Sequence, residues 1–342
     1  MRIIKPTGTK LICLTPVVNE AFELDRFLQA TSLWADHIIC GYQVSRDSTL
    51  EILEKYPKVT IVHSPNQDWN ELSMRSLLYE EARKLTAERR IIMNLDADEL
   101  ISANFMTSPE WKTILNLPKG SIIRIPWCNL QPDMQQYLPS NMIEVGFVDD
   151  GASTLSGSIM HMGRVPWPNY DINIMRCCEL KLLHYQATNT ERILSKARWY
   201  RAYEKVGKGE FGPNIYRKYS AALNPPRFLE VRSEWFNGYS DLGIDVTSVS
   251  YSYDYPNDYR LLQYLEEYGT KYFRMVDIWD KDWVQFATGK KPSPERFKDP
   301  RTIIDRLIFR YMRWSFVTEK TLFRKLIIRL LDRLLRLIGY SS

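Results

Sequence analysis

Residues 10 to 95 alternate between short β-prone apolar runs and longer segments with helical spacing. The predicted strands are 10–18, 37–42, 59–64 and 90–95, and the predicted helices are 20–34, 50–56 and 71–88. This alternation predicts an α/β fold with a doubly wound, mainly parallel sheet, because each helix carries the chain back across a face of the sheet. Ligands of such sheets bind outside the carboxyl ends of the strands, so functional residues are expected there.

Two aspartates, one residue apart, follow the fourth predicted strand. In RRIIMNLDADEL, Asp96 and Asp98 come after the apolar run and Glu99 is next. Side chains alternate along a strand, so both aspartates are expected to face the same way. Paired carboxylates suit magnesium or manganese, which complete their coordination with water and substrate phosphates. The pattern therefore indicates a divalent metal site for a diphosphate, and a solvated acidic turn is the alternative.

Composition is typical of a globular protein. The 342 residues are 44% hydrophobic and 25% charged, enough for one large domain with an appendage. The five cysteines form no C-x-x-C pattern, so we expect them to be reduced, and the start of the chain lacks the apolar stretch of a signal peptide. These features favour a cytoplasmic protein.

The pattern changes after the fourth predicted strand. Residues 121–184 contain short apolar stretches broken by proline, glycine and asparagine, which indicates antiparallel strands and long loops. Beyond residue 189 the chain becomes mostly helical. We therefore expect a first domain over 1–188 and a mostly helical C-terminal region over 189–342.

Four ordered segments resemble family 2 glycosyltransferases, which have the nucleotide-sugar-binding fold called GT-A. The segments are LTPVVNEAFELDRFL, SRDSTLEIL, ELSMRSLLYEEARKL and IIMNLDADEL, within residues 10–105. The resemblance implies that residues 1–188 form a GT-A type catalytic domain that binds a nucleotide-sugar donor. It also implies that Asp96 contacts the donor and that Asp96 and Asp98 bind the metal.

The resemblance assigns donor contacts to residues after the first two strands and on the third helix. A strand-to-helix turn also offers N–H groups to an anion, which agrees with this assignment. Asp47 could instead be a helix cap, and Arg75 could be a solvated charge. The implied nucleotide-sugar-binding residues are Thr15, Pro16, Val17, Asn19, Glu20, Asp47 and Arg75.

Tyr42 departs from the family pattern. The second strand of these enzymes commonly ends in an aspartate that recognises the nucleobase, and Tyr42 occupies that position here. Uridine is the default expectation, and guanosine or another base stays open.

Further candidates lie after the metal motif. Inverting family members use a carboxylate there as the base that activates the acceptor, and Asp149 or Asp150 fits best, with Glu144 as a substitute. Two adjacent carboxylates can repel and raise one pKa, which favours a base. His184 follows a short apolar run and could be a third metal ligand or a hydrogen-bonded strand-end residue.

Other side chains could shape the acceptor pocket. His161, Arg164 and Trp167 lie in a loop-rich segment, where a structural role for His161 is the favoured alternative, and tryptophans can stack on sugar faces or pack in a core. Trp69 and Trp127 are open to the same two interpretations.

The last predicted helix, about 321–338, is amphipathic and basic. Its apolar residues are Leu322, Phe323, Leu326, Ile327, Leu330, Leu331, Leu334, Leu335 and Ile338, and its basic residues are Arg324, Lys325, Arg329, Arg333 and Arg336. This composition favours peripheral attachment to an anionic membrane, the inner membrane surface in a cytoplasmic protein. The alternative is a helix docked on the protein's own core or on a second copy.

Together these features predict a metal-dependent glycosyltransferase that uses Mn²⁺ or Mg²⁺. The expected donor is a nucleotide diphosphate sugar, with a UDP-sugar favoured, and the acceptor is a glycan or lipid-linked glycan, as in polysaccharide biosynthesis. The resemblance implies inversion. One alternative is a sugar nucleotidyltransferase, although LTPVVNEA lacks the glycine-rich basic loop that would hold a triphosphate. Another is an inactive binding or scaffold protein. A nucleic-acid partner is not expected, since the basic residues are concentrated in one apolar-striped helix.

Overall fold

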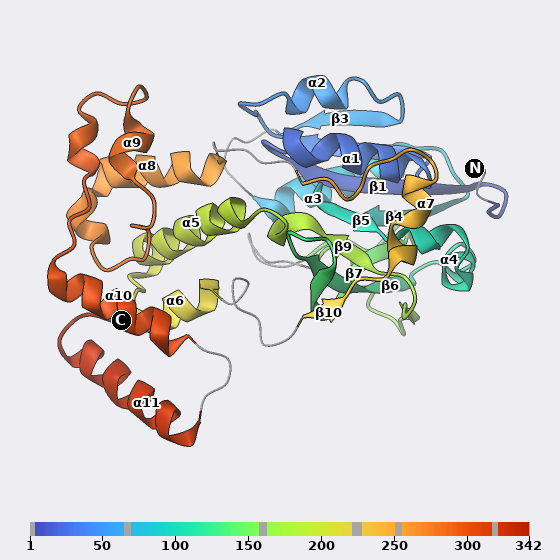
Figure 1. Ribbon diagram of the computed structural model, residues 1–342. Coiled ribbons are helices and arrows are strands. Elements are labelled where there is room, and N and C mark those ends of the chain that lie inside the picture. Colours follow the sequence, from blue (N-terminus) through green and yellow to red (C-terminus); the bar gives the residue numbers. More distant parts are fainter. Residues whose placement is uncertain are drawn as a thin grey trace. The chain divides into compact units, whose positions relative to one another are not determined.

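The computed structural model describes residues 4–64, 70–156, 163–220, 228–249, 255–316 and 321–341 (Figure 1). The chain forms two compact units. Unit 1 contains Met1–Thr188 and Leu229–Tyr251, and unit 2 contains Asn189–Phe228 and Ser252–Ser342. The chain thus leaves unit 1 after Thr188 and returns to it for a second segment.

The first half of the sheet in unit 1 is parallel. Its strands are β1 (Thr9–Val17), β2 (His37–Tyr42), β3 (Val59–His63) and β4 (Arg89–Asn94), in the order β3-β2-β1-β4. The helices between them are α1 (Ala21–Ser32), α2 (Thr49–Leu53) and α3 (Glu71–Lys84). The predicted α/β class is therefore confirmed, and the strand bounds differ from the prediction by one residue at most.

Helices cover both faces of this parallel half. On one face, Leu24 and Phe27 of α1 are buried in a cluster with Cys13 of β1. On the other face, Met74 and Leu78 of α3 are buried with alternate residues of the strands. A strand covered on both faces buries every side chain, which explains why β1 and β4 read as continuous apolar runs. The sheet is doubly wound, as expected.

The second half of the sheet is mixed and positions the site. β7 (Gln136–Val148) pairs antiparallel with β4 and with β6 (Ile122–Leu130). β9 (Leu182–His184) pairs with β6, and β5 (Glu99–Ile101) pairs antiparallel with β9, so that Glu99 lies opposite His184. This pairing brings the segment after the two aspartates next to the strand that ends at His184.

The remaining elements of unit 1 are short. β8 (Ile174–Arg176) pairs with β6, and β10 (Leu229–Glu230) pairs with β7. The others are η1 (Ala103–Met106), α4 (Pro109–Ile114), η2 (Tyr185–Ala187), η4 (Ser233–Trp235) and α7 (Asn237–Ser240).

The described part of unit 2 is helical. Its elements are α5 (Thr190–Lys208), α6 (Pro213–Ser220), α8 (Pro256–Tyr268), η5 (Thr270–Phe273), α9 (Trp283–Ala287), η6 (Pro294–Phe297), α10 (Ile303–Ser315) and α11 (Leu322–Leu337). Asn189 caps the start of α5, and Gly209 ends it in the left-handed conformation, with φ at 70°. None of the described helices is both long and apolar enough to cross a membrane.

Candidate functional site

The carboxyl end of β4 carries a cluster of charged side chains. Arg75, on α3, is 2% exposed and reaches this end of the sheet. Its Nη1 donates to Asn94 Oδ1, and its Nη2 donates to Asp96 Oδ1 at 2.8 Å. Its Nε donates to Glu71 Oε1 at 3.1 Å. Arg75 is therefore a buried ion-pairing residue at the predicted site, and the alternative of a solvated surface charge is wrong.

A second arginine completes the surroundings of Asp96. Arg164 Nη2 donates to Asp96 Oδ2 at 2.7 Å, and the same guanidinium bonds both oxygens of Glu99. Asn94 Nδ2 donates to the carbonyl of Arg164 at 2.9 Å, which holds the loop residue against β4. Both oxygens of Asp96 are thus bonded to guanidinium groups, and Glu99, which is fully buried, shares one of them.

The two arginines keep Asp96 ionised. Burial on its own would raise the pKa of this carboxyl, but the charges of Arg164 and Arg75 outweigh burial and hold it below its usual value. Burial also opposes the charge on Arg164, yet Asp96 and Glu99 raise its pKa. Asp96 and Arg164 therefore stay charged at neutral pH.

Asp98 pairs with His184. Asp98 Oδ2 lies 3.5 Å from His184 Nε2, and both residues are buried. His184 Nδ1 lies 2.7 Å from Asn129 Oδ1, an acceptor, so Nδ1 carries a proton and a neutral ring keeps its lone pair on Nε2. The Trp127 ring stacks on the imidazole at 4.6 Å between centroids, which fixes the ring plane.

This pair fits a divalent metal in its chemistry. A carboxylate and an imidazole whose other nitrogen is held by an amide oxygen form a common metal-ligand arrangement with an outer-shell partner. Asp96 fits less directly, because each of its oxygens already accepts from an arginine. Within the described residues, no group of three or more His, Cys, Asp and Glu side chains gathers as a metal site. Asp98 and His184 are therefore the candidate protein ligands.

The loops after β1 and β2 are bonded to each other. Asn19, with φ at 53°, donates its N–H to Ser45 Oγ, and Glu20 N–H donates to Thr49 Oγ1. Asp47 Oδ2 accepts from Ala21 N–H at 3.1 Å, and its Oδ1 accepts from Thr49. Asp47 thus caps the start of α1 from the neighbouring loop, whereas the helix-cap alternative concerned the helix that follows Asp47, and its contact with a donor stays a prediction.

Three further predicted donor contacts lie at the end of β1. Thr15 is fully buried, and its hydroxyl has no hydrogen-bond partner among the described residues. Pro16 and Val17 pair with Gly41 and Tyr42 of β2. Tyr42 is buried, and its hydroxyl accepts from Ser45 N–H at 3.2 Å. The tyrosine that replaces the expected aspartate therefore supports the loop after β2.

The structure places Asp149 and Asp150 at the opposite edge of the sheet from Asp96. β7 runs antiparallel to β4, and Asp149 N–H donates to the carbonyl of Arg90 at the start of β4. Six residues of extended chain, roughly 20 Å at about 3.3 Å per residue, separate Arg90 from Asp96. The two acids are thus not brought to the metal motif.

Their chemical surroundings also differ from the expectation. Asp149 is buried and accepts from Arg83 at 2.8 Å. Although burial raises the pKa of Asp150, hydrogen bonds from Ser153, Ala152 and Tyr170 lower it to about 2. The expected mutual repulsion, with one raised pKa, is therefore wrong for Asp150. The substitute, Glu144, pairs with Arg124.

Sequence reasoning missed part of the cluster. No motif marks Asn129, Asn94 lies within the segment IIMNLDADEL but has no assigned role there, and Arg164 is expected at the acceptor pocket. Glu99 could have been found, since it follows Asp98 directly and begins a strand whose residues are all buried. Trp167 is 48% exposed, and His161 and Trp69 lie outside the described residues.

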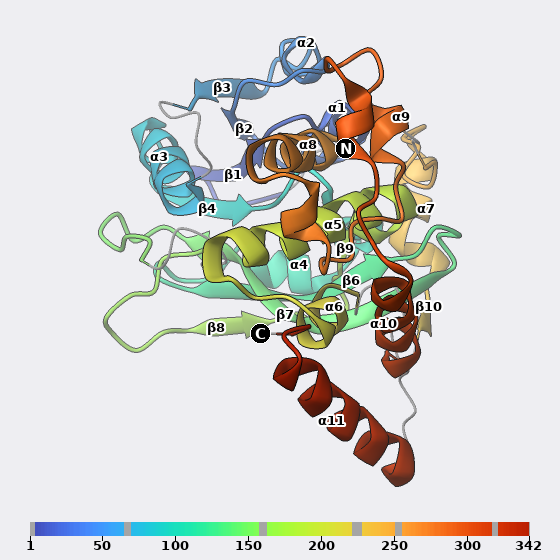
Figure 2. The same cartoon turned by 90° about the vertical axis from the view of Figure 1, so that its left-hand side faces the viewer.

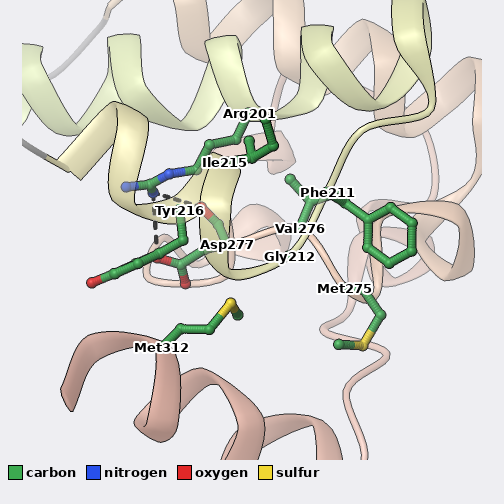
Figure 3. Close-up of a pocket in the computed structure, with 9 residues that line it drawn as sticks. All are labelled: Arg201, Phe211, Gly212, Ile215, Tyr216, Met275, Val276, Asp277 and Met312. Atoms are coloured by element: carbon green, nitrogen blue, oxygen red, sulfur yellow. Dashed lines mark hydrogen bonds and ion pairs between the residues drawn. The ribbon is translucent and has the colours of Figure 1, made fainter. Parts of the chain in front are cut away.

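Unit 2 contains a separate small cavity (Figure 3). Arg201 points across it to Asp277, donating to the carbonyl at 2.9 Å and to Oδ2 at 3.3 Å, and its other terminal nitrogen donates to Ser220. The remaining lining is Phe211, Gly212, Ile215, Tyr216, Met275, Val276 and Met312. Because its only lining arginine is already paired, this cavity offers little to an anionic donor.

No family model and no curated protein matches the chain. Among solved structures, one similar protein is glucosyl-3-phosphoglycerate synthase from Mycobacterium tuberculosis in complex with Mn²⁺, UDP and glucosyl-3-phosphoglycerate. It has a TM-score of 0.27 and 13% identity, over 35% of this chain and 44% of that chain. This chain therefore matches less than half the length of that protein.

Two further structures are similar. HddC from Yersinia pseudotuberculosis complexed with GMP-PN has a TM-score of 0.30 and 9% identity, over 54% of this chain and 96% of that chain. A 4-diphosphocytidyl-2C-methyl-D-erythritol synthase has a TM-score of 0.29 and 12% identity, over 76% of this chain and 100% of that chain. The TM-scores are low, so membership of family 2 stays a prediction and function must be argued from the geometry of the chain's own residues.

Proposed function

We propose that this protein is a metal-dependent glycosyltransferase that moves a sugar from a nucleotide diphosphate sugar to a glycan or lipid-linked glycan. The observation that carries the proposal is the cluster at the carboxyl end of β4. There, Asp96 is held ionised between Arg75 and Arg164, and Asp98 Oδ2 lies 3.5 Å from His184 Nε2. Cations and metal ligands at this edge of a parallel sheet suit an anionic diphosphate.

Each residue has a distinct task in this proposal. Asp98 and His184 would hold a Mn²⁺ or Mg²⁺ ion, which supplies charge neutralisation for the departing diphosphate. Asn129 keeps the imidazole in the tautomer that leaves Nε2 available. Arg75 and Arg164 orient Asp96 and present positive charge beside it. Thr15, Pro16 and Val17 at the end of β1 and the residues Asn19, Glu20 and Asp47 after β1 and β2 would line the nucleotide.

A sugar nucleotidyltransferase is the less favoured enzyme. The turn between β1 and α1 contains no glycine, and the N–H groups of Asn19, Glu20 and Ala21 already donate to side chains of the neighbouring loop. Fewer N–H groups of this turn are then available to cradle a triphosphate. An inactive binding protein is the remaining alternative, and it predicts nucleotide binding without turnover.

The test is calorimetric titration with UDP, GDP, CDP and dTDP, each with and without Mn²⁺. Wild type is compared with Asp98→Asn and with the control Asp36→Asn, whose carboxylate accepts from Leu11 N–H at the amino end of the sheet. We expect one nucleotide to bind in a Mn²⁺-dependent manner, with binding lost in Asp98→Asn and kept in Asp36→Asn. The sugar nucleotides of that base are then assayed for release of the diphosphate.

Three results would redirect the proposal. If no nucleotide binds, the metal-site argument loses its support. If Mn²⁺-dependent binding survives in Asp98→Asn, the Asp98 and His184 pair does not hold the metal. If the matching triphosphate binds tightly and releases pyrophosphate with a sugar phosphate, the nucleotidyltransferase alternative holds.

A further inference from the structure

One side of helix α11 is used for docking within unit 2. At 100° per residue, Ile328, Asp332 and Leu335 fall on one narrow arc of the helix. Ile328 is 6% exposed and Leu335 is 7% exposed, and Leu335 packs in a cluster with residues of α10. Asp332 accepts from Arg217 of α6 at 2.7 and 2.9 Å and from the Tyr311 hydroxyl of α10 at 2.7 Å. In Figures 1 and 2, α6 and α10 lie on the same side of α11.

A second, wider arc of α11 is apolar and exposed. Six of its side chains are each between 51% and 79% exposed, namely Phe323, Leu326, Leu330, Leu334, Leu337 and Ile338. This arc does not overlap the docking arc, so packing of α11 on the core of unit 2 leaves it uncovered. Docking of α11 on its own protein therefore accounts for only a minority of the apolar residues of this helix.

A third arc carries positive charge. Lys325, Arg329, Arg333 and Arg336 are exposed and fill the arc between the docking arc and one edge of the apolar arc. Among the described residues, no salt bridge involves any of these four side chains. Long basic side chains at the edge of an exposed apolar stripe can extend toward phosphate groups while the stripe is buried.

Helix α10 also has an exposed apolar arc with a basic side chain at its edge, smaller than that of α11. Ile303 is 80% exposed, Leu307 54% and Trp314 44%, and they lie on one arc with Arg310 at its edge. Ile308, Phe309 and Met312 of the same helix are buried on the opposite arc. Both helices thus expose apolar and basic groups outside their buried arcs, and Arg324 of α11 lies over the Trp314 ring at 4.5 Å.

We propose that the exposed arcs of α11 and α10 bind the surface of an anionic lipid bilayer. The charge argues for this occupant: a second copy of the chain would bring two sets of basic side chains together, whereas anionic headgroups complement them. The inference does not rest on the proposed glycosyltransferase activity, because none of its residues belongs to the cluster around Asp96.

The test is flotation of the full-length protein with vesicles of phosphatidylcholine alone or with 30% phosphatidylglycerol, about one lipid in three. One variant replaces the exposed apolar residues Leu326, Leu330 and Leu334 by serine. A second carries Arg329→Glu and Arg333→Glu. A control carries Lys84→Glu and Arg232→Glu, two exposed basic residues of unit 1. Point variants are preferred to truncation, because removing α11 would uncover its docking partners on α6 and α10.

We expect wild type and the control to float with the anionic vesicles and not with neutral ones. The charge-reversal variant should bind at least about tenfold more weakly, since each basic residue contributes on the order of fivefold. The serine variant should lose flotation while keeping the thermal midpoint of wild type, because the replaced side chains are exposed. Failure of wild type to float, or equal flotation of all variants, would overturn the proposal. A dimer that becomes monomeric in the serine variant, without flotation, would assign the arc to a second copy.

Discussion

Replacing Arg164 by methionine tests the ionic cluster most directly. Arg164 is 7% exposed and its guanidinium bonds both oxygens of Glu99, which is fully buried. It also donates to Asp96 at 2.7 Å. Methionine keeps much of the side-chain volume but removes every one of these hydrogen bonds. Asp96 would retain Arg75, whereas Glu99 would lose its described ion-pair partner, so most of the cost should arise at Glu99.

We expect Arg164→Met to lower the free energy of unfolding by about 3–5 kcal/mol, the usual cost of leaving one buried charge uncompensated. The assay is urea denaturation followed by circular dichroism, on Arg164→Met, Glu99→Gln and the double variant. Once Glu99 is neutral, loss of the arginine should cost less, so the double variant should be about 1–3 kcal/mol more stable than the sum of the single changes predicts. Arg232→Met, at an exposed arginine, is the control and should change stability by about 0.5 kcal/mol or less.

Two results would refute this reasoning. One is a loss below about 1 kcal/mol in Arg164→Met, which would mean that solvent already screens the cluster. The other is additivity of the two changes to within about 0.5 kcal/mol, which would mean that Arg164 and Glu99 do not interact energetically.

Three further changes have expected outcomes. Asp150→Asn should cost about 1 kcal/mol at pH 7 after allowance for solvent screening. The pKa of Asp150 in the folded state is lowered to about 2. The loss of stability in Asp150→Asn should therefore have its full size above the unfolded-state pKa of about 3.9 and disappear as the pH falls toward 2. Thermal melts at a series of pH values measure this. Asn129→Ala should weaken Mn²⁺ binding by about 10- to 100-fold in calorimetry, because His184 loses its orienting partner. Asp47→Ala should lower the free energy of unfolding by about 0.5–2 kcal/mol in urea, because α1 loses a cap and Thr49 an acceptor.

Each of these expectations has a contrary result. A stability difference for Asp150→Asn that persists at pH 2 would mean that its cause is not the carboxylate charge. Unchanged Mn²⁺ affinity in Asn129→Ala would mean that His184 is not a metal ligand that Asn129 orients. For Asp47→Ala, wild-type stability combined with lost nucleotide binding would assign the carboxylate to the donor and not to the helix cap.

The parallel half of the sheet could be predicted from the sequence because its signals are local. Burial on both faces makes β1 and β4 continuous apolar runs, and helical spacing marks α1 and α3. The prediction that Asp96 and Asp98 follow a buried strand is confirmed for the same reason. The residues of the site were harder to predict from the sequence. Arg164 reaches the site from a loop and Asn129 from a distant strand, and no periodicity marks such residues.

Asp149 and Asp150 illustrate the limit of predicting a site from the sequence. In the sequence they are simply two acids after an apolar run, as Asp96 and Asp98 are. Because β7 pairs antiparallel with β4, their run ends at the opposite edge of the sheet, where Asp149 joins Arg83 and Asp150 caps a turn. Whether a strand runs parallel or antiparallel to its neighbour depends on its pairing partner. The partner of β7 is β4, which is distant in the chain, so the sequence around β7 does not reveal the direction.

The strands and helices of the parallel half, the position of the aspartate pair at a strand end and the amphipathic character of α11 all follow from local sequence patterns. The ion pairs of Asp96 with two arginines, the approach of Asp98 to His184 through the pairing of β5 with β9, and the choice of the covered arc of α11 depend on the folded chain. The difference arises because propensity and periodicity act over a few residues. Ion pairs and register, in contrast, are set by burial between segments far apart in the chain.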